Sequence, residues 1–354
     1  MSTTATVRPH FNFEVEIELL VKPKEGNTKL YRDLKASGFD PALKPGHDAD
    51  KKKAERNRTE IRKALAAALT VCDVEAKIDG ASYETWYVKE EGSLSEVADE
   101  RGGGYWAIKL VSKIMSTDEE NWADDLENVF QVVLTNFDVL LTKGCSMHVH
   151  VAPGPKWNVT SLRNFMKATG VFDDAITKIM PAERKKNPWA RSNFHDGPGP
   201  ADKAQPALKK AFDEVPSKAW KPLFAVFDKI EMTNVLLTWG QVREVSWNLA
   251  SLHKSETVEF RRPPGVKTAA AAQKWATFAV AFVCAGTQSD WQAPWLLNKR
   301  SATVGELQSF VSSGLELLGW EHLLDTRELT ENTSSAMPLE HFDWEGVKRK
   351  LGES

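Results

Sequence analysis

Glutamate occupies every second position of an otherwise apolar segment near the N-terminus. Residues 11–19 alternate strictly, so an extended strand would place Glu14, Glu16 and Glu18 on one face. Mg2+ takes oxygen ligands, usually from a few carboxylates together with phosphate oxygens. The spacing therefore indicates that Glu16 and Glu18 could each face a metal ion within one cleft. A solvated strand face would give the same pattern.

Two further segments repeat this arrangement with other polar side chains. Residues 145–151 carry His148 and His150 at alternate positions, and a later segment pairs Glu259 with Arg261. A His-x-His pair can bind a transition metal, take part in acid–base chemistry or simply hydrogen-bond within a sheet. The Glu-x-Arg pair could be a surface ion pair, or a metal ligand beside an arginine that neutralises phosphate. Together the three motifs favour an enzyme with a metal and polyphosphate site.

Strands and helices that alternate along the chain are expected to position these motifs. We predict strands at about 11–21, 83–89, 105–111, 145–151, 241–249 and 256–262. We predict helices at about 52–70, 119–141, 160–180 and 267–284, the third of them capped by Thr160 or Ser161. This order predicts an α+β fold, in which helices cover the outer face of a mainly antiparallel sheet.

The length of 354 residues allows one large core or two smaller ones, and we expect a single domain over 1–354. Its core is expected to span 11–286, with loop insertions at about 39–53 and 196–216. A helical extension is expected at 287–354, on the basis of hydrophobic spacing alone.

The overall composition narrows the classes of function. A formal net charge of −3 argues against a surface built to bind nucleic acid. Three widely spaced cysteines lack the spacing of a metal site and suit a reducing compartment. Without an apolar signal region or a stretch long enough to cross a membrane, the chain is expected to be cytoplasmic and to have no membrane partner.

The order of the motifs resembles that of the amidoligase family, a branch of the carboxylate–amine ligases that share the glutamine synthetase and glutamate–cysteine ligase fold. The matching segments lie at residues 13–19, 86–94, 106–112, 145–151, 184–191, 247–249 and 257–262, followed by a helix that contains Trp275. Each segment is short, but their order along most of the chain makes the set more specific than any one of them.

The resemblance implies a sheet curved around an ATP site, with metal ions between carboxylates and the triphosphate. In such ligases ATP phosphorylates a carboxylate, and an amine attacks the acyl phosphate to form an amide. The positions that match metal ligands are Glu16, Glu18 and Glu259, joined by one of the two histidines, for which we take His148. His150 is a candidate catalytic residue beside it. Arg261 and Arg191 would face phosphate or acyl-phosphate oxygens.

One position departs from the family pattern. Relatives have Glu-Leu-Val-Ser where this chain has Lys109 followed by Leu-Val-Ser, and that glutamate is expected to bind metal. Lysine is a cation at neutral pH and would repel a metal ion. Lys109 could contact phosphate directly, with one metal lost, or act as an acid–base or Schiff-base group. Glu91, where relatives usually carry aspartate, is a milder change at a candidate cofactor-binding position.

We therefore expect an ATP- and Mg2+-dependent carboxylate–amine ligase that joins a small acid to an amine, for which an amino acid is one candidate. Two alternatives stay open. The chain could be a repurposed family member that catalyses an ATP-independent cyclisation or condensation, or a protein that binds a metabolite without turnover. All three take small molecules as partners.

Overall fold

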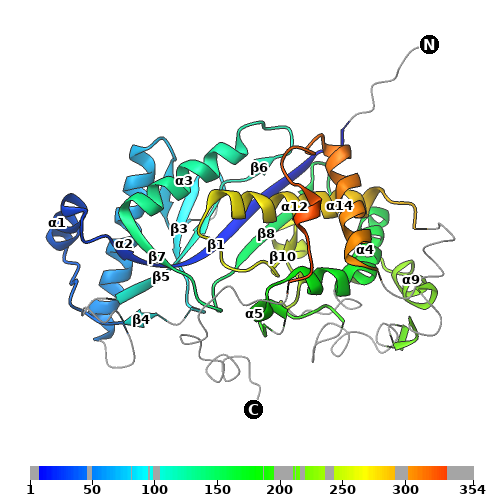
Figure 1. Ribbon diagram of the computed structural model, residues 1–354, viewed down its shortest axis with the longest axis horizontal. Helices are drawn as coiled ribbons and strands as arrows, with labels where there is room; N and C mark the ends of the chain where they lie inside the picture. The colour runs from blue at the N-terminus through cyan, green and yellow to red at the C-terminus, as the bar shows by residue number, and fades with distance from the viewer. Residues whose placement is uncertain are drawn as a thin grey trace, which may run out of the picture.

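A long central strand, β1 (Phe11–Pro23), runs through the middle of the protein and pairs along both of its edges (Figure 1). The computed structural model describes residues 8–45, 50–80, 82–94, 96–98, 104–185, 187–194, 210–211, 213–215, 220–235, 243–291 and 302–332. Within them the architecture is α+β with a mostly antiparallel open sheet, which confirms the predicted fold class. The closer likeness to the glutamine synthetase fold stays a prediction.

The sheet follows the order β2-β3-β5-β1-β8-β10-β9. The bounds on this path are β2 Ala76–Ile78, β3 Trp86–Glu90, β5 Gly104–Val111, β8 Met147–Pro153, β10 Val258–Phe260 and β9 Trp247–Asn248. Off it, β4 (Val97–Ala98) pairs with β5, while β6 (Met115–Ser116) and β7 (Phe137–Leu140) pair with β1. The β2–β3 pair is parallel and the other pairs are antiparallel.

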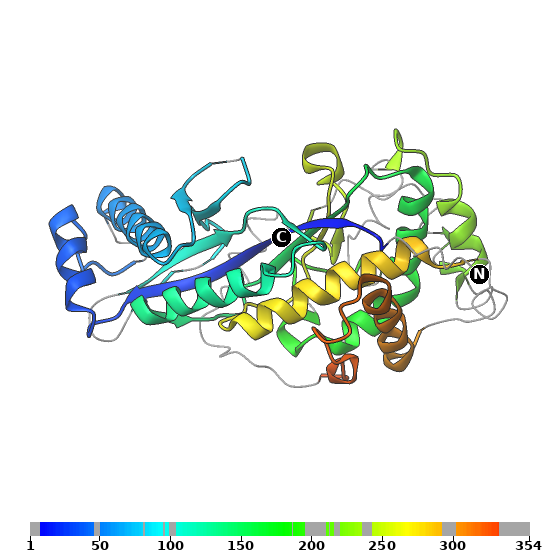
Figure 2. The same cartoon turned by 90° about the horizontal axis from the view of Figure 1, so that it is seen from above.

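The helices of the described residues have the bounds α1 Thr28–Ser37, α2 Lys51–Val71, α3 Trp122–Asn136, α4 Val159–Ile179, α5 Ala182–Lys185, α9 Lys221–Phe227, α11 Leu252–Ser255, α12 Ala269–Gln288 and α14 Val304–Leu318, with a 3-10 turn at Thr326–Glu328. α3 and α12 lie side by side along one side of β1 (Figure 2), and α2 packs on β2 and β3. α12 lies along β8 and β1, and α4 and α14 pack against α12. None of these helices combines the length and apolar character needed to span a membrane.

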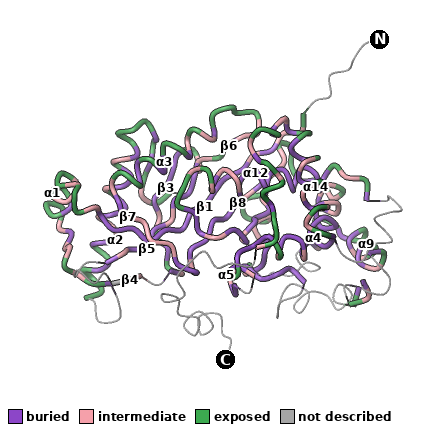
Figure 3. The backbone as a smooth tube through the Cα atoms, viewed as in Figure 1, coloured by how far each residue is buried: buried purple, intermediate pink, exposed green. Residues whose placement is uncertain are grey.

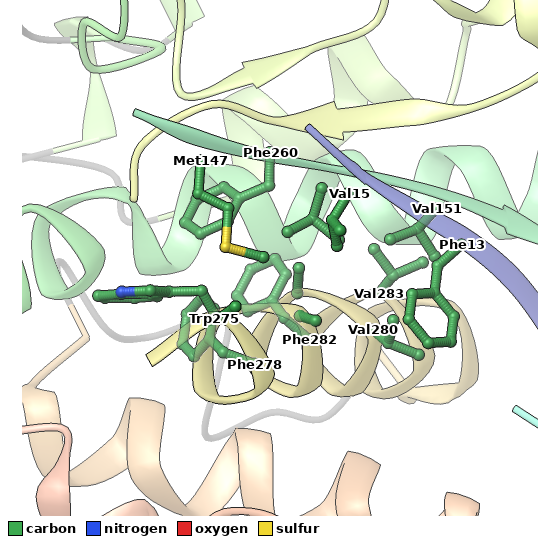
Figure 4. Close-up of a cluster of buried hydrophobic side chains, with 14 of the residues drawn as sticks. Phe13, Val15, Met147, Val151, Phe260, Trp275, Phe278, Val280, Phe282 and Val283 are labelled. Atoms are coloured by element: carbon green, nitrogen blue, oxygen red, sulfur yellow. The ribbon is translucent and has the colours of Figure 1, made fainter. Parts of the chain in front are cut away.

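The apolar side chains of the central strands form the core with α12 (Figure 4). Successive side chains of a strand point to opposite faces, so the apolar half of each alternating motif faces this helix. From the strands come Phe13, Val15, Met147, Val151 and Phe260, and from the helix come Trp275, Phe278, Val280, Phe282 and Val283. The polar half of each motif must therefore lie on the other face of the sheet.

Several boundaries differ from those predicted. The helix predicted for 119–141 ends at Asn136, because residues 137–140 form β7 and pair with the C-terminal end of β1. That pairing satisfies backbone groups that would otherwise be left at an open edge. α4 begins at Val159, and Asn158, whose side chain accepts a hydrogen bond from the Ser161 amide at 2.9 Å, is its cap.

Other predicted elements are shorter or fall outside the described residues. Of the strand predicted at 241–249, only Trp247–Asn248 is a strand among the described residues. The loop predicted at 196–216 is described only at 210–211 and 213–215, and the extension predicted at 287–354 only at 287–291 and 302–332. β2 and β7 were not predicted, since strands of three or four residues carry too little pattern.

The contact between α12 and α14 yields a stability prediction. A Cβ at Gly314 would lie 2.1 Å from the Ala281 carbonyl oxygen, so Gly314→Ala must push the two helices apart. We expect it to lower the free energy of unfolding by about 1–3 kcal/mol in urea denaturation. Gly305→Ala, in the same helix with no atom nearer than 3.9 Å, is the matched control and should be neutral or slightly stabilising. Equal losses in both variants would contradict this packing argument.

Candidate active site

A cavity of about 860 Å3 opens on the polar face of the sheet, opposite the core. Its walls include Glu14, Glu16 and Glu18 from β1, whose apolar neighbours Phe13 and Val15 point into the core. Most residues of β1 and β8 are buried (Figure 3). The alternating pattern read from the sequence is thus the physical reason that charged groups gather on this face.

The pairing of the strands sets which polar residues meet. Across β1 and β8, Glu16 lies opposite His148 and Glu14 lies opposite His150. Across β10 and β8, Glu259 lies opposite His150. Directly opposed residues of neighbouring strands point to the same face, with Cβ atoms about 4.5–5.5 Å apart. The three predicted motifs therefore form one continuous site.

Lys109, on β5, lies at the centre of an acidic cluster. Its Nζ forms ion pairs with three carboxylates: Glu91 at 2.9 Å, Glu16 at 3.0 Å and Glu18 at 3.5 Å. Burial alone would lower the pKa of this ammonium, but the three carboxylates outweigh burial and raise it. Burial alone would raise the pKa of Glu91, but the charge of Lys109 and a hydrogen bond donated by the Ser93 amide at 2.7 Å lower it. Lys109 is thus firmly held as a cation.

His148 is buried under the cavity and has protein partners at both ring nitrogens. Its Nδ1 lies 3.0 Å from the Glu16 carboxylate, and its Nε2 lies 2.9 Å from the Ser146 hydroxyl. Ser146 also donates to Glu18, through its amide at 3.1 Å and its hydroxyl at 2.5 Å. Burial and the charge of Arg261 lower the pKa of His148. This imidazole therefore links the two glutamates below the cavity floor.

Glu259 is a buried carboxylate whose charge is balanced by Arg261. It accepts hydrogen bonds from the Arg261 guanidinium and from the Asn248 side-chain amide, the latter at 2.6 Å. Burial alone would raise the pKa of this carboxyl, but Arg261 and, less strongly, the two histidines hold it at about 2. A buried ion pair of this kind depends on such additional hydrogen bonds, because both groups have lost their hydration.

Two overlapping groups of side chains could hold a metal ion. They are Glu14, Glu16 and His150, and Glu16, His148 and Glu259, each with ligand atoms within 4.8 Å of one another. In the first group, His150 Nδ1 lies 3.0 Å from the Thr257 hydroxyl, while Nε2 is buried and has no hydrogen-bond partner among the described residues. Metal-binding histidines characteristically have such a partner on the second nitrogen. The carboxylate oxygen nearest to Nε2, Glu259 Oε1, lies 3.7 Å away. Two carboxylates and an imidazole nitrogen without a hydrogen-bond partner fit a divalent cation such as Mg2+ or Mn2+.

Comparison with known protein families identifies the family of the chain. Residues 12–197, slightly more than half of the chain, match a family described as "Putative amidoligase enzyme". The chain belongs to the amidoligase family. Membership confirms the predicted resemblance and indicates an enzyme of the ligase type that forms amide bonds. No curated protein matches the chain.

The structure of this amidoligase brings together most of the predicted site residues. Lining the cavity are Glu16, Glu18, Glu91, Lys109, His150, Glu259 and Arg261, with His148 beneath them. Arg191 is buried and is not among the lining residues; its peptide group bonds to Glu244 and Ser246. The sequence analysis assigned no role to Glu14, although its spacing of two residues from Glu16 placed it on the same strand face.

Glu14 yields a pH-dependent stability prediction for the metal-free amidoligase. Burial and the nearby Glu16 raise the pKa of Glu14 from 4.5 to about 7, against the opposing effect of His150 and Lys89. The folded state therefore favours the protonated form, and this contribution to stability is complete below pH 4.5 and lost as the pH rises through 7. We expect Glu14→Gln to stabilise the protein, and to do so by about 1–3 kcal/mol more at pH 8 than at pH 5.

Urea denaturation in the presence of a chelator measures this difference. Glu127→Gln, on the exposed side of α3, is the control and should change stability equally at both pH values. A Glu14→Gln variant whose stability follows that of the wild type across this range would contradict the assignment of a buried carboxyl with a raised pKa.

Proposed function

We propose that this amidoligase is an ATP- and Mg2+-dependent carboxylate–amine ligase that makes an amide through an acyl phosphate. The observation that carries the proposal is that possible ligands of a cation and a guanidinium line the same cavity. Glu14, Glu16 and His150 offer ligands to a cation, and beside them Arg261 presents a guanidinium to the same space. A nucleoside triphosphate with its metal ion requires ligands for the cation and a positive charge beside the phosphoryl oxygens.

The reaction requires two transfers. The substrate carboxylate attacks the γ-phosphorus of ATP, which forms the acyl phosphate and releases ADP. The amine then attacks the acyl carbon, which forms the amide bond and releases phosphate, and the proton lost by the amine leaves with the phosphate. A divalent cation held by Glu14, Glu16 and His150 would supply charge stabilisation on the phosphoryl oxygens.

Arg261 is well placed to orient the phosphoryl group. Its guanidinium lines the cavity, and the Glu259 carboxylate on one side and the Trp189 carbonyl, 3.4 Å from Nε, on the other fix its plane. Burial alone would lower the pKa of Arg261, but Glu259 and the neighbouring glutamates outweigh it and raise it, so the charge is permanent. A fixed, charged fork of this kind suits phosphate or acyl-phosphate oxygens.

The ionisation of Lys109 weighs against the ATP-independent alternative. A Schiff-base or general-base lysine needs a lowered pKa, so that the neutral amine is available. The carboxylates around Lys109 raise its pKa instead. Its charge is compatible with a role in which a cation balances anions, and that is the role expected next to a polyphosphate.

ADP release from the purified protein, with a panel of acids and amines, tests the proposed reaction. Release should require both substrates and Mg2+, and Glu16→Gln should reduce it by roughly 100-fold or more, since one ligand of the cation is lost. Glu127→Gln should leave the rate unchanged, because it lies on the exposed side of α3. Product formation without ATP, or full activity of Glu16→Gln, would exclude the proposed mechanism.

Arg261→Lys tests the phosphoryl-orienting role separately. Lysine keeps the positive charge beside Glu259 but loses the planar fork, so folding should be retained while kcat falls by roughly 100-fold. Steady-state kinetics with a melting curve of the same sample separate these effects. An unchanged kcat would place Arg261 outside the reaction.

A further inference from the structure

We infer that the Lys109 ammonium is a built-in cation that occupies the place of a second divalent ion, so that this site binds a single metal ion. The inference rests on the proposed function, because it concerns how the same site balances the charge of its carboxylates and of a bound triphosphate. It assigns Lys109 a positioning and charge-balancing role at the metal centre.

The surroundings of Lys109 resemble those of a hard cation. Its Nζ contacts the carboxylates of Glu91, Glu16 and Glu18 at 2.9–3.5 Å, and the side chain is 18% exposed. An ammonium carries three donors, and Nζ lies at hydrogen-bond distance from Glu16 and Glu91 and forms a longer ion pair with Glu18. Without a cation at this point, three carboxylates would share a confined space and repel one another. Lysine removes that repulsion without any bound ion.

The Lys109 side chain is positioned by a strand of the sheet, β5, and not by a loop. Lys109 lies opposite Glu18 in the β1–β5 pair and opposite Lys89 in the β3–β5 pair. Glu91 follows directly after β3 and also lines the cavity. The position of the charge is therefore fixed by backbone pairing, as the position of a metal ion would be fixed by its ligands.

Among the described residues, one group of possible ligands remains available for a divalent cation. In the group of Glu16, His148 and Glu259, the Glu259 carboxylate is already paired with Arg261, and both ring nitrogens of His148 have protein partners. What remains is the group formed by Glu14, Glu16 and His150, in which the imidazole Nε2 has no hydrogen-bond partner among the described residues. One divalent ion fits there, next to the ammonium and on the cavity side of the sheet.

Titration of the full-length protein with Mn2+ alone, followed by electron paramagnetic resonance of the free ion, tests this inference. The wild type should bind about one Mn2+ per chain. Lys109→Met, which exposes Glu16, Glu18 and Glu91, should bind about two, because carboxylate oxygens are suitable ligands for this ion. Lys109→Arg retains the charge and should bind about one.

Lys89→Met is the matched control. Lys89 lines the same cavity and lies opposite Lys109, and its Nζ lies 5.7 and 5.3 Å from the ring centroids of Tyr83 and Tyr87. Its charge lowers the pKa of Glu14, but it forms no ion pair with a carboxylate among the described residues. Removing its charge opens no group of carboxylates, so the count should stay at about one. A second ion in this variant would show that any lost charge increases metal binding, and would overturn the specific role of Lys109.

The wild-type count separates failure of the inference from failure of the proposed function. Two Mn2+ ions per wild-type chain, or a single ion in folded Lys109→Met, would overturn the inference alone. No bound Mn2+ in the wild type would also contradict the metal-dependent function. If Lys109→Met does not fold, the wild-type count and that of Lys109→Arg still decide between one ion and two.

Discussion

The central constraint of this structure is that β1 carries opposite chemistry on its two faces and is paired along both edges. One face buries apolar side chains against α12, and the other supports the carboxylates of the cavity. Because the side-chain period of a strand is two, neither face can shift without the other. The register of β1 with β5 and β8 consequently decides both how the core packs and which charged groups meet.

Carboxylates gathered on one face of β1 would repel one another, and cations on the neighbouring strands compensate this repulsion. β5 supplies the Lys109 ammonium, and β10 supplies the Arg261 guanidinium next to Glu259. Each cation lies within direct contact of the anion it balances, which is what buried charges need to remain ionised. The exception is Glu14, which burial keeps partly protonated near neutral pH. Glu14, a carboxyl without a cation in contact among the described residues, thus belongs to the group best suited to bind a metal ion.

Much of this arrangement could be predicted from sequence, because the informative segments are strands with strict alternation. The strands that carry Glu16, Lys109, His148 and Glu259 were predicted, and so was their convergence on one site. The ion pairs of Lys109 with Glu16 and Glu18 could not be predicted, since they depend on pairing between β1 and β5, which are distant in the sequence. The end of α3 was misjudged for the same reason: residues 137–140 continue an apolar pattern, and only the free edge of β1 makes them a strand. Arg191 was assigned from resemblance alone, and the structure places its peptide group in a bridge with Val245.

The origin of the site in four distant segments has a consequence for how the protein folds. Glu16, Lys109, His148 and Glu259 meet only after β1 has paired with strands that are synthesised much later. Contacts of such long sequence separation form slowly, because the chain must first close large loops. The complete ligand set is therefore absent from partly folded chains. A bound ion or nucleotide would act on the finished sheet, slowing its opening more than it speeds its formation.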